Sequence, residues 1–397
     1  MHRFDPRIYL FTLGHFSVDW AQGAIPALLP YFISVCNLNY QDAGTLIFAN
    51  ILLSSIAQPV FGYYADRVSK PWFVPAGPII SGVSLAVLPF VTDYWLIFLC
   101  SMFSGFGSAV YHPEAARMVN GLAGAQKGKA LGAFSVGGNA GFAVGPMFAG
   151  FCAYVFDIHG LVFYGVLNVV AALLIHRYMS GILADLAKEK RAEQTAHAGL
   201  VQENDWPSFG KLSLVILARS TGFCVCNAFI PLFWIHVLGT SESTGSFALT
   251  LLFALGAFIT YFGGILSDRL GFIKMLRVSF LVMIPVMFLL VRCTDAVVAT
   301  ILLVPAAFAL FAPYSGIVVL GQTYLGKNIA FASGVTLGLQ GTLGGLVTPL
   351  VGRAADSYGI VTALQILWLV AVLGAVASFT LHTPEALKKK ENRRLLP

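Results

Sequence analysis

Apolar runs separated by short polar stretches make up most of the chain. A helix needs about 17–25 residues to cross the hydrocarbon core of a bilayer, and each run reaches that length. The runs lack the strict alternation of barrel strands, so helices are the structure that satisfies their backbone groups in lipid. The pattern predicts an all-α membrane protein with twelve transmembrane helices, at residues 8–35, 41–64, 73–92, 94–118, 129–155, 159–180, 210–238, 243–266, 275–292, 295–325, 328–352 and 359–381.

The composition agrees with this pattern. Hydrophobic residues form 57% of the 397 residues and charged residues 11%, whereas about a quarter of the residues of a soluble domain are charged. The net charge of +6 does not indicate nucleic-acid binding, because its lysines and arginines fall in short loops and tails. The first run is long and contains Asp19 and two prolines, so we expect it to remain as the first helix rather than to be a cleaved signal peptide.

The basic residues predict the orientation in the membrane. Of the 24 lysines and arginines, 21 lie at one set of helix ends; the exceptions are Arg219 within a run and Arg292 and Arg353 at the opposite ends. Because Lys and Arg accumulate in cytoplasmic loops, both termini are expected in the cytoplasm. A multi-pass protein of the cytoplasmic membrane is the predicted location.

The sequence contains an internal repeat of about half its length. Asp66 and Asp268 occupy equivalent loops 202 residues apart, about half the chain length. We predict a first six-helix half at 1–180, a cytoplasmic linker at 181–209 with a surface helix, a second half at 210–382 and a basic tail at 383–397. Prolines also recur at offsets near 200, and broken helices at matching positions are typical of transporters with a substrate site between their repeats.

The repeated loop carries the most specific motif. It reads Gly62-x-x-x-Asp66-Arg67-x-x-Lys70, and a degenerate copy contains Gly264, Asp268 and Arg269. The motif resembles the loop between the second and third helices of the major facilitator superfamily, although Ser69, Pro71 and Phe272 depart from that family's pattern.

The resemblance implies a conformational gate. Asp66, alongside Arg67, would contact a helix terminus of the other half and stabilise a closed cytoplasmic side. The alternative is an ordinary turn whose Arg and Lys obey the positive-inside rule.

The fifth run contains regularly spaced glycines before a proline: Gly132, Gly141, Gly145 and Pro146. Glycines let helix backbones touch, and a proline bends a helix. The spacing resembles the antiporter motif of exporters in this superfamily, with Ala149 in place of one glycine. Generic packing of small residues between membrane helices is the alternative interpretation.

Two membrane runs contain ionisable residues. His15, Asp19 and Gln22 share one helical face of the first run, and an ionisable group at that depth is a functional hypothesis by default. We predict that Asp19 exchanges a proton near neutral pH; the alternative is a structural hydrogen bond with His15. In the fourth run, Glu114 and Arg117 can pair at i and i+3 towards the cytoplasmic end, and that pair could be purely structural.

The His112-Pro-Glu114-Ala segment, together with His15-x3-Asp19, resembles the fosmidomycin-resistance branch of the same superfamily. That resemblance covers the first half and, more weakly, the second. It implies a proton-driven efflux pump, with His15, Asp19, His112 and Glu114 as candidates for proton coupling. Ser101 occupies the place of an arginine that drug exporters usually have in the fourth helix, so coupling would rest on other residues.

Arg219 is the single base well inside the second half and would suit an anionic substrate. Its alternative is snorkelling towards the cytoplasmic end of its helix. Further polar or aromatic side chains are candidates for the substrate cavity, although each could equally serve helix packing: Gln22, Asn227, Trp234, Tyr314, Gln340 and Gln365.

These features predict a secondary transporter that exports a small drug-like or anionic compound in exchange for protons. Uptake of a nutrient by the same fold and a membrane sensor without transport are the alternatives. An enzyme is not expected, because no nucleophile and base arrangement is present. Neither a cofactor nor a metal site is expected, since no metal-ligand motif occurs, and the proton gradient would supply the energy. The expected partners are a small-molecule substrate, protons and the lipid bilayer, and the protein is expected to be a monomer that does not bind nucleic acid.

Overall fold

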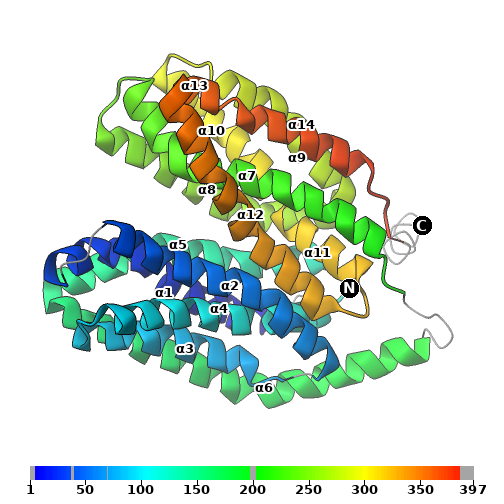
Figure 1. Ribbon diagram of the computed structural model, residues 1–397. Helices are drawn as coiled ribbons and strands as arrows, with labels where there is room; N and C mark the ends of the chain where they lie inside the picture. Colours follow the sequence, from blue (N-terminus) through cyan, green and yellow to red (C-terminus); the bar gives the residue numbers. More distant parts are fainter. Residues whose placement is uncertain (1–4, 37–39, 69, 197–202, 385–397) are drawn as a thin grey trace. The chain divides into compact units, whose positions relative to one another are not determined.

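The computed structural model describes residues 5–36, 40–68, 70–196 and 203–384, and these are almost entirely helical. The α-helices of the described residues, in chain order, are α1 (Ile8–Val35), α2 (Tyr40–Arg67), α3 (Phe73–Val87), α4 (Tyr94–Leu122), α5 (Lys127–Phe156), α6 (Val162–Ala196), α7 (Trp206–His236), α8 (Glu242–Leu270), α9 (Phe272–Leu290), α10 (Ala296–Phe311), α11 (Tyr314–Tyr324), α12 (Ile329–Tyr358), α13 (Ile360–Ala363) and α14 (Ile366–Phe379) (Figure 1). Short 3-10 turns at Leu88–Phe90 and Ile158–Leu161 extend α3 and precede α6.

The predicted spans correspond to these helices. Within the described residues, eight helical stretches are long and apolar enough to cross a membrane by length and composition. The more polar helices α1, α2, α5 and α12, of 28 to 30 residues each, complete the twelve. The span predicted at 295–325 is divided, because α10 ends at Phe311 and α11 begins at Tyr314, after Pro313.

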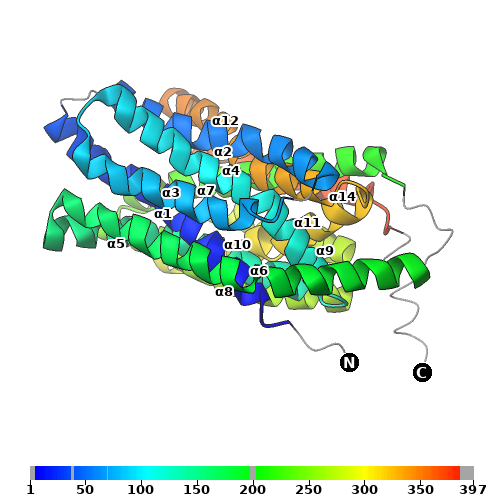
Figure 2. The ribbon, with the colours of Figure 1, turned by 90° about the horizontal axis from the view of Figure 1, so that it is seen from below.

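The helix expected within the linker at 181–209 is present as a continuation of α6, which runs to Ala196, past the predicted end of its span at residue 180. Both views show α6 running beyond the helices it packs with (Figures 1 and 2). Residues 197–202 of the linker and 385–397 of the basic tail lie outside the described part of the chain.

Two compact units divide the chain. The first comprises residues 1–126, 133–202 and 328–338, and the second comprises 127–132, 203–327 and 339–397. The start of α5 is therefore grouped with the second unit and the start of α12 with the first. In the second unit, α14 packs on α7 and α9, and α10 packs on α8 and α9.

In the first unit, α4 packs against α1, α2 and α3, while α6 packs against α1 and α3. A buried amide fixes three of these helices together. Asn168 of α6 accepts a hydrogen bond from Trp20 Nε1 at 2.6 Å and donates to the backbone carbonyls of Ser17 and Pro78 at 2.9 and 3.1 Å. Because every partner is a fixed group on α1 or α3, this amide determines how those helices meet α6.

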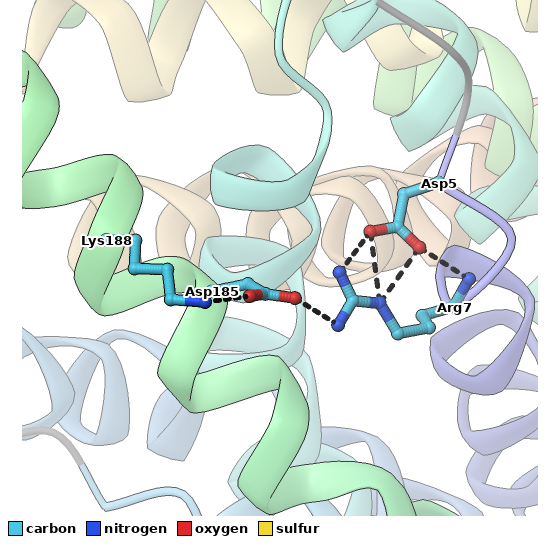
Figure 3. Close-up of polar contacts among 4 residues, drawn as sticks. All are labelled: Asp5, Arg7, Asp185 and Lys188. Atoms are coloured by element: carbon cyan, nitrogen blue, oxygen red, sulfur yellow. Dashed lines mark hydrogen bonds and ion pairs between the residues drawn. The ribbon is translucent and has the colours of Figure 1, made fainter.

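An ion-pair network joins the start of α1 to α6 (Figure 3). Arg7 donates to both oxygens of Asp5, with a shortest separation of 2.6 Å, and its Nη1 donates to Asp185 Oδ2 at 2.8 Å. Lys188 lies 3.5 Å from the other oxygen of Asp185. Burial raises the pKa of Asp5, but the hydrogen bonds from Arg7 outweigh it, and the pKa of this carboxyl is lowered overall.

Candidate functional site

Three ionisable side chains meet inside the first unit. His15 Nε2 lies 3.1 Å from Asp19 Oδ2, and His112 Nε2 lies 3.6 Å from Asp19 Oδ1. All three residues are at most 6% exposed. The i, i+4 spacing on α1 makes the first contact, and the packing of α4 against α1 brings His112 to the same carboxylate. We call His15, Asp19 and His112 the buried triad.

The hydrogen-bond donors and acceptors of the buried triad imply one additional proton. His15 Nδ1 lies 2.8 Å from the carbonyl oxygen of Phe134, which can only accept, so Nδ1 carries hydrogen. In a neutral ring, Nε2 would then face Asp19 Oδ2 with a lone pair, and two acceptors at 3.1 Å repel each other. A proton on either Asp19 or His15 turns this contact into a hydrogen bond. The arrangement therefore suits a proton shared between the two side chains.

Two further features surround the buried triad. Ser108 Oγ lies 2.9 Å from His112 Nδ1 and orients that ring. Within the described residues, Asp19 Oδ1 has no hydrogen-bond partner although it is buried. A buried oxygen without a partner is costly, so this atom is a position where a further cation or proton donor would be stabilised.

Gly138 of α5 packs directly against the buried triad. A Cβ added there would lie 2.7 Å from Asp19 Oδ2 and would collide with His15 Nε2. Farther along α5, a Cβ on Gly141 would lie 2.7 Å from the carbonyl oxygen of Phe16, and one on Gly145 would collide with the carbonyl of Trp20. Gly141 and Gly145 of the predicted antiporter motif thus allow α5 to touch the backbone of α1, and Pro146 lies within the same helix. Gly132 of that motif instead faces the Thr260 carbonyl of α8.

The predicted pair on α4 is present. Arg117 Nη2 and Nε donate to the two oxygens of Glu114 at 2.6 and 2.9 Å, and Glu114 is fully buried. A bidentate guanidinium stabilises the ionised carboxylate. Glu114 is therefore paired with a guanidinium, whereas the partners of Asp19 are imidazoles. Gln22, one turn beyond Asp19 on α1, is also buried.

The repeated loop motif forms the same contact twice. In the first unit, Asp66 accepts hydrogen bonds from the backbone N–H groups of Ala330 and Phe331, both at 2.8 Å, at the start of α12. In the second unit, Asp268 accepts from the N–H groups of Gly128 and Lys129, at 3.0 and 2.8 Å, at the start of α5.

The motif glycines are required by close backbone packing. A Cβ on Gly62 would collide with the Ala330 carbonyl, and one on Gly264 would collide with the Gly128 carbonyl. The predicted contact of Asp66 with a helix terminus from the other half of the sequence is confirmed. Arg67 instead stacks on Tyr63, with its Cζ 4.1 Å from the ring centroid, and remains exposed, as do Lys70 and Arg269.

Arg219 is buried in the second unit. It is 3% exposed, its Nε donates to the Leu310 carbonyl at 2.7 Å, and its Cζ lies 4.9 Å from the ring centroid of Tyr314. The snorkelling interpretation is therefore wrong, since the guanidinium is held between α7 and the segment joining α10 to α11. A planar cation stacked on an aromatic ring is suited to bind a carboxylate or phosphonate.

Of the predicted substrate residues in the second half, Tyr314 lies against Arg219, whereas Trp234 and Gln365 make other contacts. Trp234 lines a small apolar cavity with Val225, Phe229 and Leu290, and Asn227 is exposed. The side chain of Gln340 lies outside the described part of the structure. Gln365 receives a hydrogen bond from Trp368 Nε1 at 2.8 Å and so serves local packing.

Sequence reasoning did not identify Gly138, Ser108 or the Phe134 carbonyl, although all three shape the buried triad. Gly138 could have been found, because it lies in the glycine-rich stretch of α5 that contains Gly141 and Gly145. The other two contacts depend on the rotation of α4 and α5 about their axes, which a single sequence does not encode locally.

Comparisons with known proteins agree with this architecture. The family model described as Major Facilitator Superfamily matches residues 11–305. The chain is 27% identical to the fosmidomycin resistance protein of Escherichia coli over 379 residues, which cover 93% of this chain and 91% of that protein. It is 26% identical to an uncharacterised MFS-type transporter of Bacillus subtilis, YfnC, over 97% of this chain and 94% of that protein.

Solved structures share the fold. The E. coli fucose:proton symporter superposes with a TM-score of 0.73 at 16% sequence identity, over 96% of this chain and 100% of that chain. The model match spans well over half of the chain, and the helical architecture agrees with it. This chain belongs to the major facilitator superfamily, and it is a multi-pass membrane transporter.

Proposed function

We propose that this transporter is a proton-coupled antiporter that exports a small drug-like or anionic compound. The observation that carries the proposal is the buried triad, whose donor and acceptor pattern accommodates one exchangeable proton between His15 and Asp19. The likeness to the fosmidomycin resistance protein, and the 23% identity to the quinolone resistance protein NorA of Staphylococcus aureus, favour export over uptake.

The proton would act through the charge on α1. When the proton is bound, the hydrogen bond between His15 and Asp19 is complete; when it leaves, a carboxylate and a ring lone pair repel each other inside a packed helix bundle. This repulsion would be relieved if α1 moved relative to α5 or if a cation bound between the side chains. Because glycines of α5 pack closely against the backbone of α1, a movement of α1 would displace both helices. Proton binding and substrate binding can then bias the same conformational equilibrium in opposite directions.

Arg219 would recognise the substrate's negative charge. Its Nε donates to the Leu310 carbonyl, and the buried guanidinium would attract an anion through charge-assisted contacts. Stacking on Tyr314 keeps the guanidinium plane fixed, so little side-chain freedom is lost on binding. The substrate class is accordingly a small carboxylate, phosphate or phosphonate.

The energy source and the placement of the protein in the membrane complete the proposal. No cofactor is needed, because the proton gradient supplies the free energy. The protein would act as a monomer in the cytoplasmic membrane with both termini in the cytoplasm, the orientation that the distribution of basic residues favours.

Substrate-induced proton movement tests the proposal. Purified protein is reconstituted into liposomes with an internal pH dye, and small anionic and drug-like compounds are added under a proton gradient. We expect at least one compound to drive opposite proton flux in wild-type vesicles. Asp19→Asn, which mimics the protonated carboxyl, should abolish uphill transport.

Two variants sharpen this test. Asp93→Asn is the matched control, because Asp93 caps α4 from an exposed position and asparagine caps helices equally well. It should transport like wild type. Glu114→Gln addresses the competing carboxyl. If Glu114→Gln loses coupling while Asp19→Asn pumps normally with an unchanged pH profile, proton coupling belongs to α4 and the assignment to Asp19 is wrong.

A further inference from the structure

We propose that the buried triad is also a binding site for one divalent transition-metal ion of the Zn²⁺ class. His15, Asp19 and His112 each offer one ligand atom, and these atoms all lie within 4.8 Å of one another. Two imidazole nitrogens and one carboxylate oxygen, with an open fourth position, form a ligand set that zinc commonly takes in proteins.

The separations of the ligand atoms suit a tetrahedral ion. Bonds of about 2.0–2.1 Å from a zinc ion place neighbouring tetrahedral ligands roughly 3.3 Å apart. His15 Nε2 and Asp19 Oδ2 are 3.1 Å apart, and His112 Nε2 and Asp19 Oδ1 are 3.6 Å apart. These two contacts involve different oxygens of Asp19, and the three ligand atoms lie within 4.8 Å of one another, so side-chain rotations would have to bring one oxygen and both nitrogens around a single ion.

The outer hydrogen bonds hold both rings in the orientation that binding needs. His15 Nδ1 donates to the Phe134 carbonyl, so Nε2 keeps its lone pair and directs it into the buried triad. His112 Nδ1 contacts Ser108 Oγ at 2.9 Å, which leaves its Nε2 facing Asp19. Metal-bound histidines typically anchor the second ring nitrogen in this way, and such partners raise metal affinity.

The charge balance also favours a cation. Asp19 Oδ1 is buried and has no hydrogen-bond partner within the described residues. An ion between the rings would satisfy this oxygen and remove the repulsion between Asp19 Oδ2 and the His15 lone pair. The mixed nitrogen and oxygen ligands favour Zn²⁺, Co²⁺ or Ni²⁺ over Mg²⁺ or Ca²⁺, which prefer oxygen ligands alone.

This site was not foreseen from the sequence, from which no metal site was expected. His15 and Asp19 supply an i, i+4 pair, but the third ligand lies on another helix, so no local spacing motif reveals it. The inference goes beyond the proposed function. Equilibrium metal binding to purified protein needs neither substrate nor a proton gradient. The absence of proton coupling would therefore not argue against the metal site, and the absence of metal binding would not argue against proton coupling.

Binding of Zn²⁺ and Co²⁺ to the purified full chain tests the site. The protein is prepared in detergent without a polyhistidine tag and stripped of metal, and calorimetry measures the stoichiometry. We expect one ion per chain, and a visible absorption spectrum of tetrahedral type with Co²⁺. His112→Gln and Asp19→Asn should each weaken binding by at least about tenfold, while size-exclusion chromatography confirms that the variants remain monodisperse.

Two further variants make the outcome decisive. His159→Gln removes a histidine that is not part of the buried triad and whose side chain is 59% exposed. This variant should bind the metal ion like wild type. Gly138→Ala keeps every ligand but places a methyl group against His15 Nε2 and Asp19 Oδ2, and should lose the ion. Absence of stoichiometric binding in the wild type, or binding that His112→Gln, Asp19→Asn and Gly138→Ala leave unchanged, would overturn the proposal.

Discussion

Arg219 and Arg292 both stack on an aromatic ring, but their surroundings differ. Arg219 is buried and also donates from Nε to the Leu310 carbonyl, whereas Arg292 is exposed, with its Cζ 3.8 Å from the Phe288 ring centroid. A lysine at position 219 cannot donate to the carbonyl and present a planar fork at the same time. The contacts of Arg219 therefore depend on its planar guanidinium, whereas those of the exposed Arg292 do not.

Arg219→Lys should weaken binding of an anionic substrate by about 10–100-fold, since a charge-assisted hydrogen bond contributes about 1.5–3 kcal/mol. A neutral transported compound should lose much less. Arg292→Lys is the control and should leave both affinities unchanged. Competition binding to purified protein measures the effect. Equal loss for anionic and neutral compounds would show that Arg219 acts only in packing.

A second residue-scale prediction concerns stability in acid. The pKa of Asp5 is lowered by Arg7, so its contribution is fully present above the unfolded-state pKa and is lost as pH falls through the folded-state pKa. Arg7→Gln should cost about 1 kcal/mol near pH 7, because the network is partly exposed. It should also flatten the dependence of Tm on pH between about 5 and 3. Thermal unfolding in detergent tests this, and a wild-type acid profile in the variant would contradict it.

Side-chain chemistry could be predicted from the sequence where it depends on local spacing. The contacts of His15 with Asp19 and of Glu114 with Arg117 follow from i, i+4 and i, i+3 positions on one helix. The approach of His112 to Asp19 could not be predicted, because it joins residues 93 apart through the packing of α4 on α1.

At the scale of elements, the two carboxylates of the repeated motif bind equivalent helix termini. Each carboxylate accepts hydrogen bonds from two backbone N–H groups that have no partner within their own helix. Each also places a negative charge at the positive, N-terminal end of the helix dipole. Asp66→Asn and Asp268→Asn should each lose about 0.3–2 kcal/mol of this contact. A loss of that size changes the ratio of two conformations by up to about 30-fold.

Transport should therefore slow in both variants while purified protein still binds substrate. Vesicle transport and binding assays on the same preparations separate these effects. Gly62→Ala is a steric counterpart, since its methyl group would collide with the Ala330 carbonyl, and it should impair transport even with Asp66 intact. Wild-type transport rates in Asp66→Asn would contradict a gating role.

The sequence predicts a helix end well where the apolar run and the helix end at the same residue. It does not predict the end of a helix that continues beyond the apolar run into water. The first run was predicted at 8–35, and α1 spans Ile8–Val35. In α6 the hydropathy falls near residue 180, but Lys, Glu and Ala continue the helix to Ala196 because they are good helix formers in water. Hydropathy identifies the part of a helix that favours lipid, whereas backbone propensity decides where the helix ends.

At the scale of the whole molecule, the internal repeat of the sequence predicts the architecture. Matching motifs 202 residues apart predicted two related halves, and the contacts of Asp66 and Asp268 repeat the same geometry. The grouping of residues 127–132 with the second unit and 328–338 with the first could not be foreseen. It arises because each carboxylate binds a helix start from the other half of the chain.

Orientation is the property of the whole molecule that charge predicts most directly. Lysines and arginines at one set of helix ends number 21 of 24, an asymmetry that predicts a cytoplasmic position for those ends. In a variant with all six native cysteines replaced by serine, single cysteines at positions 157 and 242 should react in intact cells with a maleimide that does not cross membranes. Cysteines at positions 69 and 194 should react only after the membrane is permeabilised.

The choice of positions makes this labelling test specific. Asp157 follows α5, with its side chain 80% exposed, and position 242 begins α8, so both report on the ends opposite the basic clusters. Position 194 lies on the extension of α6, 14 residues beyond the predicted end of its span at residue 180. Native Cys36, Cys152 and Cys293 lie near the ends expected outside, which is why they must be removed first. Labelling of positions 69 and 194 in intact cells would reverse the orientation, and Asp66 and Asp268 would then lie on the outer side, where they could not close a cytoplasmic gate.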